Sequence, residues 1–150
     1  MRARPHHLID IICQYGAGTP FKPSSYGHAV HLVAAEVIEN ADMSIEFVVR
    51  ADDICEPCVH LVDGLCDDTI TLCDPPISKQ EYNDTLDRRV LGALGMADGR
   101  QMTFREYLRI LRSHLAALRT VYSHPDVLAL GDDPDRRLAR LEAGLEKFGA

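Results

Sequence analysis

Apolar residues recur every three to four positions over most of the chain, and this spacing predicts a largely helical protein. The first helical segment starts at Pro5 and ends at Gly16 or Gly18. The second is predicted to start at Ser25 and to reach about Asn40. Proline suits the first turn of a helix, glycine its end, and serine is a favourable N-cap. Two helices are therefore expected before the first alternating segment.

Capping sequences predict where the later helices start. Ser78 and Thr103 are each followed three residues later by glutamate, which is the pattern of a capping box. The helix that starts after Ser78 is predicted to end at Gly95. The helix that starts after Thr103 is predicted to be the longest one, from Phe104 to Tyr122, because leucines recur along it at helical spacing.

One segment alternates with a period of two. In residues 44–50, Ile45, Phe47 and Val49 share one side of an extended chain, which predicts a strand. A single strand is not stable alone. Its expected partner is either the segment 69–72 or a strand of another subunit, which leaves a homodimer open.

The end of the chain is predicted to hold one more helix. Residues 123–132 form a linker, and Asp133 with Pro134 provides an N-terminal cap. Together the patterns predict a mainly α (α+β) fold with about five helices, one short strand element and one long loop. The length of 150 residues is that of a single domain.

The long loop, residues 52–76, carries the most specific chemical signal. It is acidic, rich in turn residues and free of Lys and Arg, so it has little apolar material of its own to fold around. It holds four of the five cysteines: Cys55, Cys58, Cys66 and Cys73. In a reducing compartment such thiols indicate a metal ion or an iron–sulfur cluster, and a disulfide is the alternative.

The spacing within this cysteine loop bears on which metal is bound. Cys55 and Cys58 lie across a short turn, where two thiolates can chelate one metal ion or neighbouring irons of a cluster. Structural zinc sites usually combine one such pair with a second one, and this chain has no second pair. The pattern therefore favours an iron–sulfur cluster and keeps zinc as the alternative.

The first helix carries a polar stripe on an otherwise apolar surface. His6, Asp10 and Cys13 follow one another at i, i+4 and i+7, so they share one face. Polar groups on a buried helix need partners, and the cysteine loop would supply them. By contrast, His28 and His31 share the polar face of the second predicted helix and are expected to face solvent.

Composition excludes some partners. The net charge of −7 argues against a nucleic-acid or anionic-membrane surface as the main partner, because both need a basic footprint. No apolar run reaches the length of a membrane span, and the N-terminus does not have the pattern of a secretory signal. The expected compartment is the cytoplasm.

Several motifs together resemble a known family. They are RPHH at residues 4–7, DDICEPC at 52–58, Gly64 with Cys66, and LGALG at 91–95. The chain resembles domain-of-unknown-function family 1284, a group of small bacterial and archaeal proteins described as predicted iron–sulfur-binding proteins. The resemblance covers roughly residues 2–115 and makes these the metal-binding core, with 124–150 as a helical extension. It implies a cluster, with 4Fe–4S favoured, but no defined reaction.

The resemblance also implies a ligand set. Three positions carry over directly: Cys55, Cys58 and Cys66. The family usually has a first-helix cysteine where this chain has Asp10, so the fourth ligand is open among Asp10, Cys13 and Cys73. Cys13 is favoured, because the family places a first-helix cysteine at the cluster. His6, His7 and Asp10 would then lie beside the cluster.

Three functions follow from these expectations. The first is electron transfer or redox sensing, with a redox partner protein. The second is an enzyme that uses an iron with an open coordination position as a Lewis acid. The third is a zinc-stabilised interaction module. No phosphate-binding glycine loop, nucleophile elbow or HExxH helix is present, so the sequence carries little direct sign of an enzyme.

Overall fold

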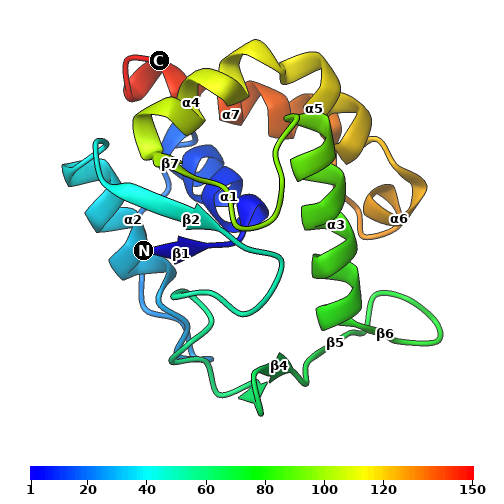
Figure 1. Ribbon diagram of the computed structural model, residues 1–150. Coiled ribbons are helices and arrows are strands. Elements are labelled where there is room, and N and C mark those ends of the chain that lie inside the picture. Colours follow the sequence, from blue (N-terminus) through cyan, green and yellow to red (C-terminus); the bar gives the residue numbers. More distant parts are fainter.

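The structure is a computed structural model of residues 1–150, and helices dominate it (Figure 1). The helices are α1 (Pro5–Gly16), α2 (Val30–Glu39), α3 (Lys79–Ala93), α4 (Phe104–Ser113), α5 (Leu115–Tyr122), α6 (Pro125–Leu128) and α7 (Pro134–Lys147). The strands are β1 (Arg2–Ala3), β2 (Ser44–Phe47), β3 (Leu61–Val62), β4 (Leu65–Cys66), β5 (Thr69–Ile70), β6 (Ile77–Ser78) and β7 (Gln101–Thr103). This is an α+β fold with seven helices, where the sequence predicted about five.

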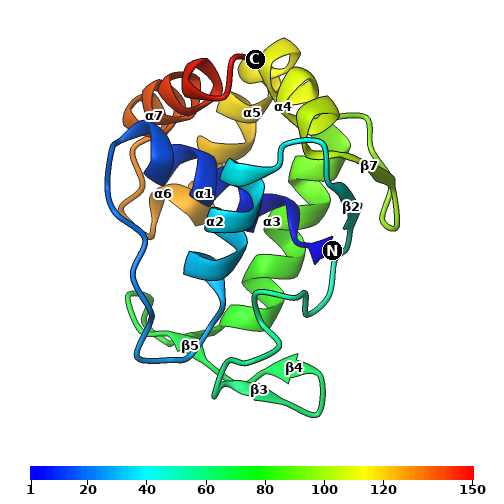
Figure 2. The ribbon, with the colours of Figure 1, turned by 90° about the vertical axis from the view of Figure 1, so that its left-hand side faces the viewer.

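Helix α1 lies at the centre of the fold. Its apolar residues cover most of its circumference, and Leu8, Ile9, Ile11 and Ile12 are all fully buried. Helices α2, α3 and α7 surround it, and the cysteine loop forms the end of the molecule opposite α4 and α7 (Figures 1 and 2). None of the helices combines the length and the apolar character that crossing a membrane requires.

Helices α1 and α7 approach each other so closely that glycine is required at the contact. A Cβ atom on Gly144 would collide with the carbonyl oxygen of Ile12, and one on Gly16 would collide with the carbonyl oxygen of Arg140. Leu141 and Leu145 of α7 belong to the same hydrophobic core as α1. Helix α7 is therefore packed into the core around α1.

We expect Gly144→Ala to lower the free energy of unfolding by about 1–3 kcal/mol, because the added methyl group must push α7 away from the α1 backbone. Chemical denaturation in urea measures this difference. Gly92→Ala is the matched control, since a Cβ atom there meets nothing within 4 Å. Alanine at this helical position should raise stability by roughly 0.5–1 kcal/mol. Equal effects of the two substitutions would contradict the close α1–α7 contact.

The predicted strand is confirmed as β2, but the prediction of its partner is wrong. Strand β2 pairs in parallel with β1 and antiparallel with β7, in the order β1-β2-β7. The segment 69–72, predicted as a partner, instead contributes β5, which pairs with β6. Strands β1 and β7 are two and three residues long, too short for a period of two to be recognised in the sequence.

The second helix starts later than predicted. Ser25 does not cap it, and α2 begins at Val30. The residues between them pair with the cysteine loop instead: the amide of Ala29 donates to the carbonyl of Ile54 at 2.9 Å, and the carbonyl of Tyr26 accepts from the amide of Val59 at 2.9 Å. These tertiary hydrogen bonds replace the first turn that the pattern predicted.

The longest predicted helix is divided in two. Helix α4 ends at Ser113 and α5 starts at Leu115, with His114 between them at a φ of −120°. The hydroxyl of Ser113 donates to the carbonyl of Ile110 at 3.0 Å, and such local bonds compete with the helical ladder. The short helix α6 lies in the segment that was predicted to be a linker.

Candidate metal centre

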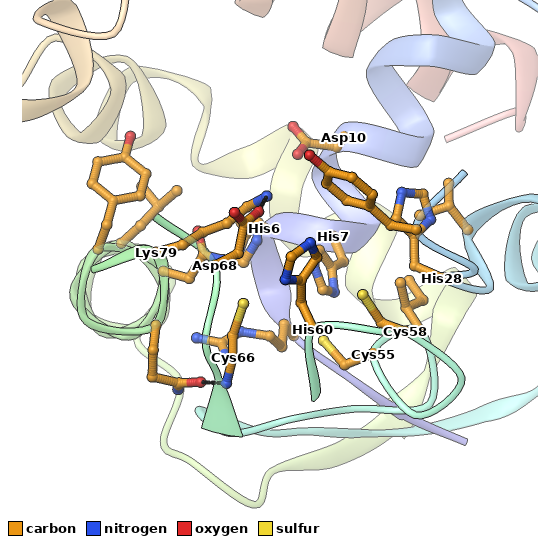
Figure 3. Close-up of a pocket in the computed structure, with 18 of the residues that line it drawn as sticks. His6, His7, Asp10, His28, Cys55, Cys58, His60, Cys66, Asp68 and Lys79 are labelled. Carbon is orange, nitrogen blue, oxygen red and sulfur yellow. Dashed lines mark hydrogen bonds and ion pairs between the residues drawn. The ribbon is translucent and has the colours of Figure 1, made fainter. Parts of the chain in front are cut away.

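A cavity of about 560 Å³ lies between the start of α1, the start of α3 and the cysteine loop. Figure 3 shows Cys55, Cys58 and Cys66 of the cysteine loop together with His6 and His7 from the start of α1. The predicted site residues that line it are Cys55, Cys58, Cys66, His6, His7 and Asp10. The structure thus brings together most of the residues that the sequence had marked.

A tight hairpin positions Cys66. Strands β3 and β4 pair Leu61 with Cys66, and their two-residue turn is Asp63–Gly64. Both turn residues have positive φ, 50° and 81°, a conformation that Asp-Gly adopts readily in hairpins. The amide of Cys66 donates to the side-chain oxygen of Gln80 at 2.8 Å, which ties the hairpin to the start of α3.

Asp52 connects the first helix to the cysteine loop. Its side chain is buried and accepts from the amide of Arg4 at 2.7 Å and from the amide of Cys55 at 3.0 Å. The same carboxylate lies 2.9 Å from Nδ1 of His7. Burial alone would raise the pKa of Asp52, but the His7 ring and the hydrogen bonds outweigh it, so the pKa is lowered. Asp52 therefore stays ionised.

Asp87 of α3 holds the ring of His6 in the way that Asp52 holds the ring of His7. One of its oxygens lies 2.8 Å from Nδ1 of His6 and accepts from the His6 amide at 3.1 Å. The other accepts from Nε of Arg4 at 2.6 Å. Burial favours a raised pKa for Asp87, but the His6 and Arg4 groups outweigh it and the pKa is lowered.

Both histidines are therefore held at Nδ1 by a buried carboxylate. With the proton on Nδ1, the Nε2 atom of each ring is left as an acceptor. Buried carboxylates orient the imidazole ligands of metal ions in this way. Neither Asp52 nor Asp87 was among the predicted site residues. Asp52 lay in the DDICEPC motif, but nothing in the sequence connected Asp87 with His6.

One subset of these groups is already close enough to share a metal ion. A ring nitrogen of His7, a carboxylate oxygen of Asp52 and Sγ of Cys55 lie within 4.8 Å of one another. Because Asp52 already accepts hydrogen bonds from two amides and the ring, its role is to orient the other two groups. Burial and the nearby Asp52 raise the pKa of the Cys55 thiol to about 12, and a bound metal would displace that proton.

Of the three residues considered as a fourth ligand, Asp10 alone lines the cavity with the three cysteines. Cys13 is buried on the α7 side of α1, and its Sγ lies 3.6 Å from the carbonyl oxygen of Arg137. Neither Cys13 nor Cys73 is among the residues that line the cavity. Asp10 does line it, but its carboxylate forms an ion pair with Arg137. Ligation by Cys13 is untested, and the position of its thiol against α7 gives it no support.

The predicted placement of His28 on the second helix is wrong, and the residue is half-buried. His28 precedes α2 and lines the cavity, and burial lowers its pKa. His60 also lines the cavity, with its Nδ1 2.8 Å from Asp67 and its ring 4.7 Å from that of Tyr26. The late start of α2 accounts for the different position of His28.

These features define an α+β protein in which cysteines of one loop and histidines of one helix line a common cavity. Residues 24–123 match the sequence model of the family described as "Protein of unknown function (DUF1284)", and the chain belongs to this family. No curated protein and no solved structure matches the chain. The match confirms the family that the motifs predicted. It includes the cysteine loop but not α1, so the roles of His6 and His7 rest on the geometry of this chain.

Proposed function

We propose that this protein binds a 4Fe–4S cluster through the thiolates of Cys55, Cys58 and Cys66. The observation that carries the proposal is that these three side chains line a single cavity. Cysteine thiolates are the usual protein ligands of such clusters, and three half-buried thiols in one cavity fit that requirement. No fourth cysteine lines the cavity, which supports a centre with three thiolate ligands.

The cluster would supply Lewis-acid or one-electron chemistry to a molecule bound in the cavity. The residues of the chain would position that molecule. His6 and His7 are fixed by Asp87 and Asp52, so their Nε2 atoms are acceptors that do not need to reorient. A ring nitrogen of His7 lies within 4.8 Å of Sγ of Cys55. His7 is therefore the best candidate among the side chains for the fourth ligand of the cluster.

Electron transfer or redox sensing is the second candidate, and the surface of the cysteine loop favours it. Val59, Val62 and Leu65 expose 68%, 49% and 60% of their surface. They lie within a few residues of the three cysteines, so a redox partner protein that contacts them would come near the centre. Exposed apolar side chains are common where proteins dock.

Zinc is the third candidate, because Cys55, Cys58, Cys66 and His7 line the same cavity and would make a Cys₃His set. The protein is purified anaerobically, and its absorption spectrum and its content of iron, sulfide and zinc are measured. These measurements distinguish a zinc site from an iron–sulfur cluster. The proposal predicts a brown protein with iron and acid-labile sulfide in similar amounts. A colourless protein that holds one zinc ion per chain would contradict it.

A further inference from the structure

The cavity continues beyond the cysteines, along α1 toward α5 and the start of α7. Tyr122, Leu130 and Arg137 line this far part. A volume of about 560 Å³ is in the range of cavities that hold small organic molecules. Half of the 26 lining residues are hydrophobic. The cavity is therefore of a size to hold a small organic ligand.

The cations of the lining are all paired with carboxylates. Arg137 forms ion pairs with Asp10 and Asp132. The two other cations of the lining are also paired, Lys79 with Asp68 and Arg4 with Asp84 and Asp87. A charged ligand would have to break one of these pairs or enter without a counter-ion, and an unpaired charge in a partly buried site is costly.

Neutral polar groups, in contrast, are left without a partner. The hydroxyl oxygen of Tyr122 and Nδ1 of His28 are buried and form no hydrogen bond within the protein. Both residues line the cavity, and Tyr122 is only 1% exposed. Burial raises the pKa of Tyr122 well above its usual value, so its hydroxyl keeps its proton and can donate. A buried polar group without a partner is unfavourable, and a ligand atom would remove that cost.

We propose that this cavity binds an uncharged small molecule with hydroxyl or carbonyl groups on an apolar body, and that the Tyr122 hydroxyl donates to one of its oxygens. His28 offers a second polar contact to the same class of ligand. The hydrophobic half of the lining would contact the apolar body. This site does not depend on the proposed cluster, because Tyr122 and His28 belong to neither the loop nor the histidine pair that would hold a metal.

The test is an NMR titration of the isotopically labelled full-length protein with four probes that share one ring: cyclohexanone, cyclohexanol, cyclohexanecarboxylate and cyclohexylammonium. We expect the two uncharged probes to shift the resonances of cavity-lining residues and to bind about tenfold more tightly than the two ions, because the ions enter a site whose charges are already paired. Tyr122→Phe should weaken binding of cyclohexanone by about three- to tenfold, the value of one hydrogen bond.

Tyr15→Phe is the control, because Tyr15 lies against Phe148 and does not line the cavity. It should leave the affinity unchanged. The proposal is overturned if an ion binds as tightly as the uncharged probes, if no lining residue responds, or if Tyr122→Phe binds as well as the original protein. Iron is measured in the same samples and the titration is repeated on metal-free protein. Loss of the cluster and loss of ligand binding are then observed separately.

Discussion

Cys66→Ser is expected to lower the iron content of the protein by at least about tenfold, and Cys55→Ser and Cys58→Ser should do the same. Loss of groups that merely orient a metal ligand already costs 10–100-fold in affinity, so loss of a ligand should cost no less. Each of the three thiols lines the cavity and is half-buried, so serine should be tolerated by the fold. Iron and sulfide analysis of the anaerobically purified variants measures the effect.

Cys73→Ser and Cys13→Ser are the matched controls. Neither residue lines the cavity, and we expect both variants to keep the metal content of the original protein. Cys13→Ser should lower stability, since it replaces a thiol of the hydrophobic core with a smaller and more polar hydroxyl group. If Cys13→Ser instead loses its metal while folded, the fourth ligand comes from α1, as the family resemblance implied.

Asp87→Asn is expected to lower the free energy of unfolding by about 3–5 kcal/mol, the usual result of breaking a buried ion pair. Asp87 is fully buried, and Arg4, which it binds at 2.6 Å, is only 2% exposed. The substitution leaves the Arg4 guanidinium with Asp84 as its one anionic partner and removes the charge that holds His6. Urea denaturation at neutral pH measures the loss.

Asp42→Asn serves as the control for this experiment, and the effect of Asp87→Asn is expected to depend on pH. Asp42→Asn breaks an exposed pair with Arg105 and should change stability little. Because folding lowers the pKa of Asp87, its carboxylate contributes stability above its unfolded pKa of about 3.9 and loses that contribution as the pH falls through its folded pKa. The difference in free energy of unfolding between Asp87→Asn and the original protein should therefore become smaller at acidic pH. If this difference does not depend on pH, the carboxylate charge of Asp87 is not the cause of the lost stability.

Capping residues in the sequence correctly predicted where several helices start. Pro5 starts α1, and the side chains of Ser78, Thr103 and Asp133 cap the three helices that follow them. Each of these signals involves residues within one turn of the helix end, so no tertiary contact is needed to recognise them.

Tertiary contacts decided the parts that could not be predicted. Strands β1 and β7 exist because β2 lies between them, and their few residues carry no period of their own. Ser25 has the character of an N-cap, but the following residues hydrogen-bond to the cysteine loop. A helix-capping pattern cannot reveal such a competitor, because the competing groups at Ile54 and Val59 lie far along the chain.

The candidate site shows the same division. The spacing of Cys55, Cys58 and Cys66 predicted residues that line one cavity, because a short loop keeps its members close. Helical periodicity also placed Cys13 on the face of α1 that carries His6 and Asp10. It could not show which other helix or loop packs against each turn of α1. In the structure, the Arg137 carbonyl of α7 lies against the thiol of Cys13.

Anaerobic alkylation of the thiols, read by peptide mass spectrometry before and after treatment with a metal chelator, tests the three-cysteine centre most directly. We predict that Cys55, Cys58 and Cys66 are protected in the metal-loaded protein and become labelled after chelation. Cys55 should label slowly even after chelation, because burial and Asp52 raise its pKa to about 12. Cys73 should label equally in both states. Labelling of any of the three before chelation, or protection of Cys73 that disappears with the metal, would contradict the proposed centre.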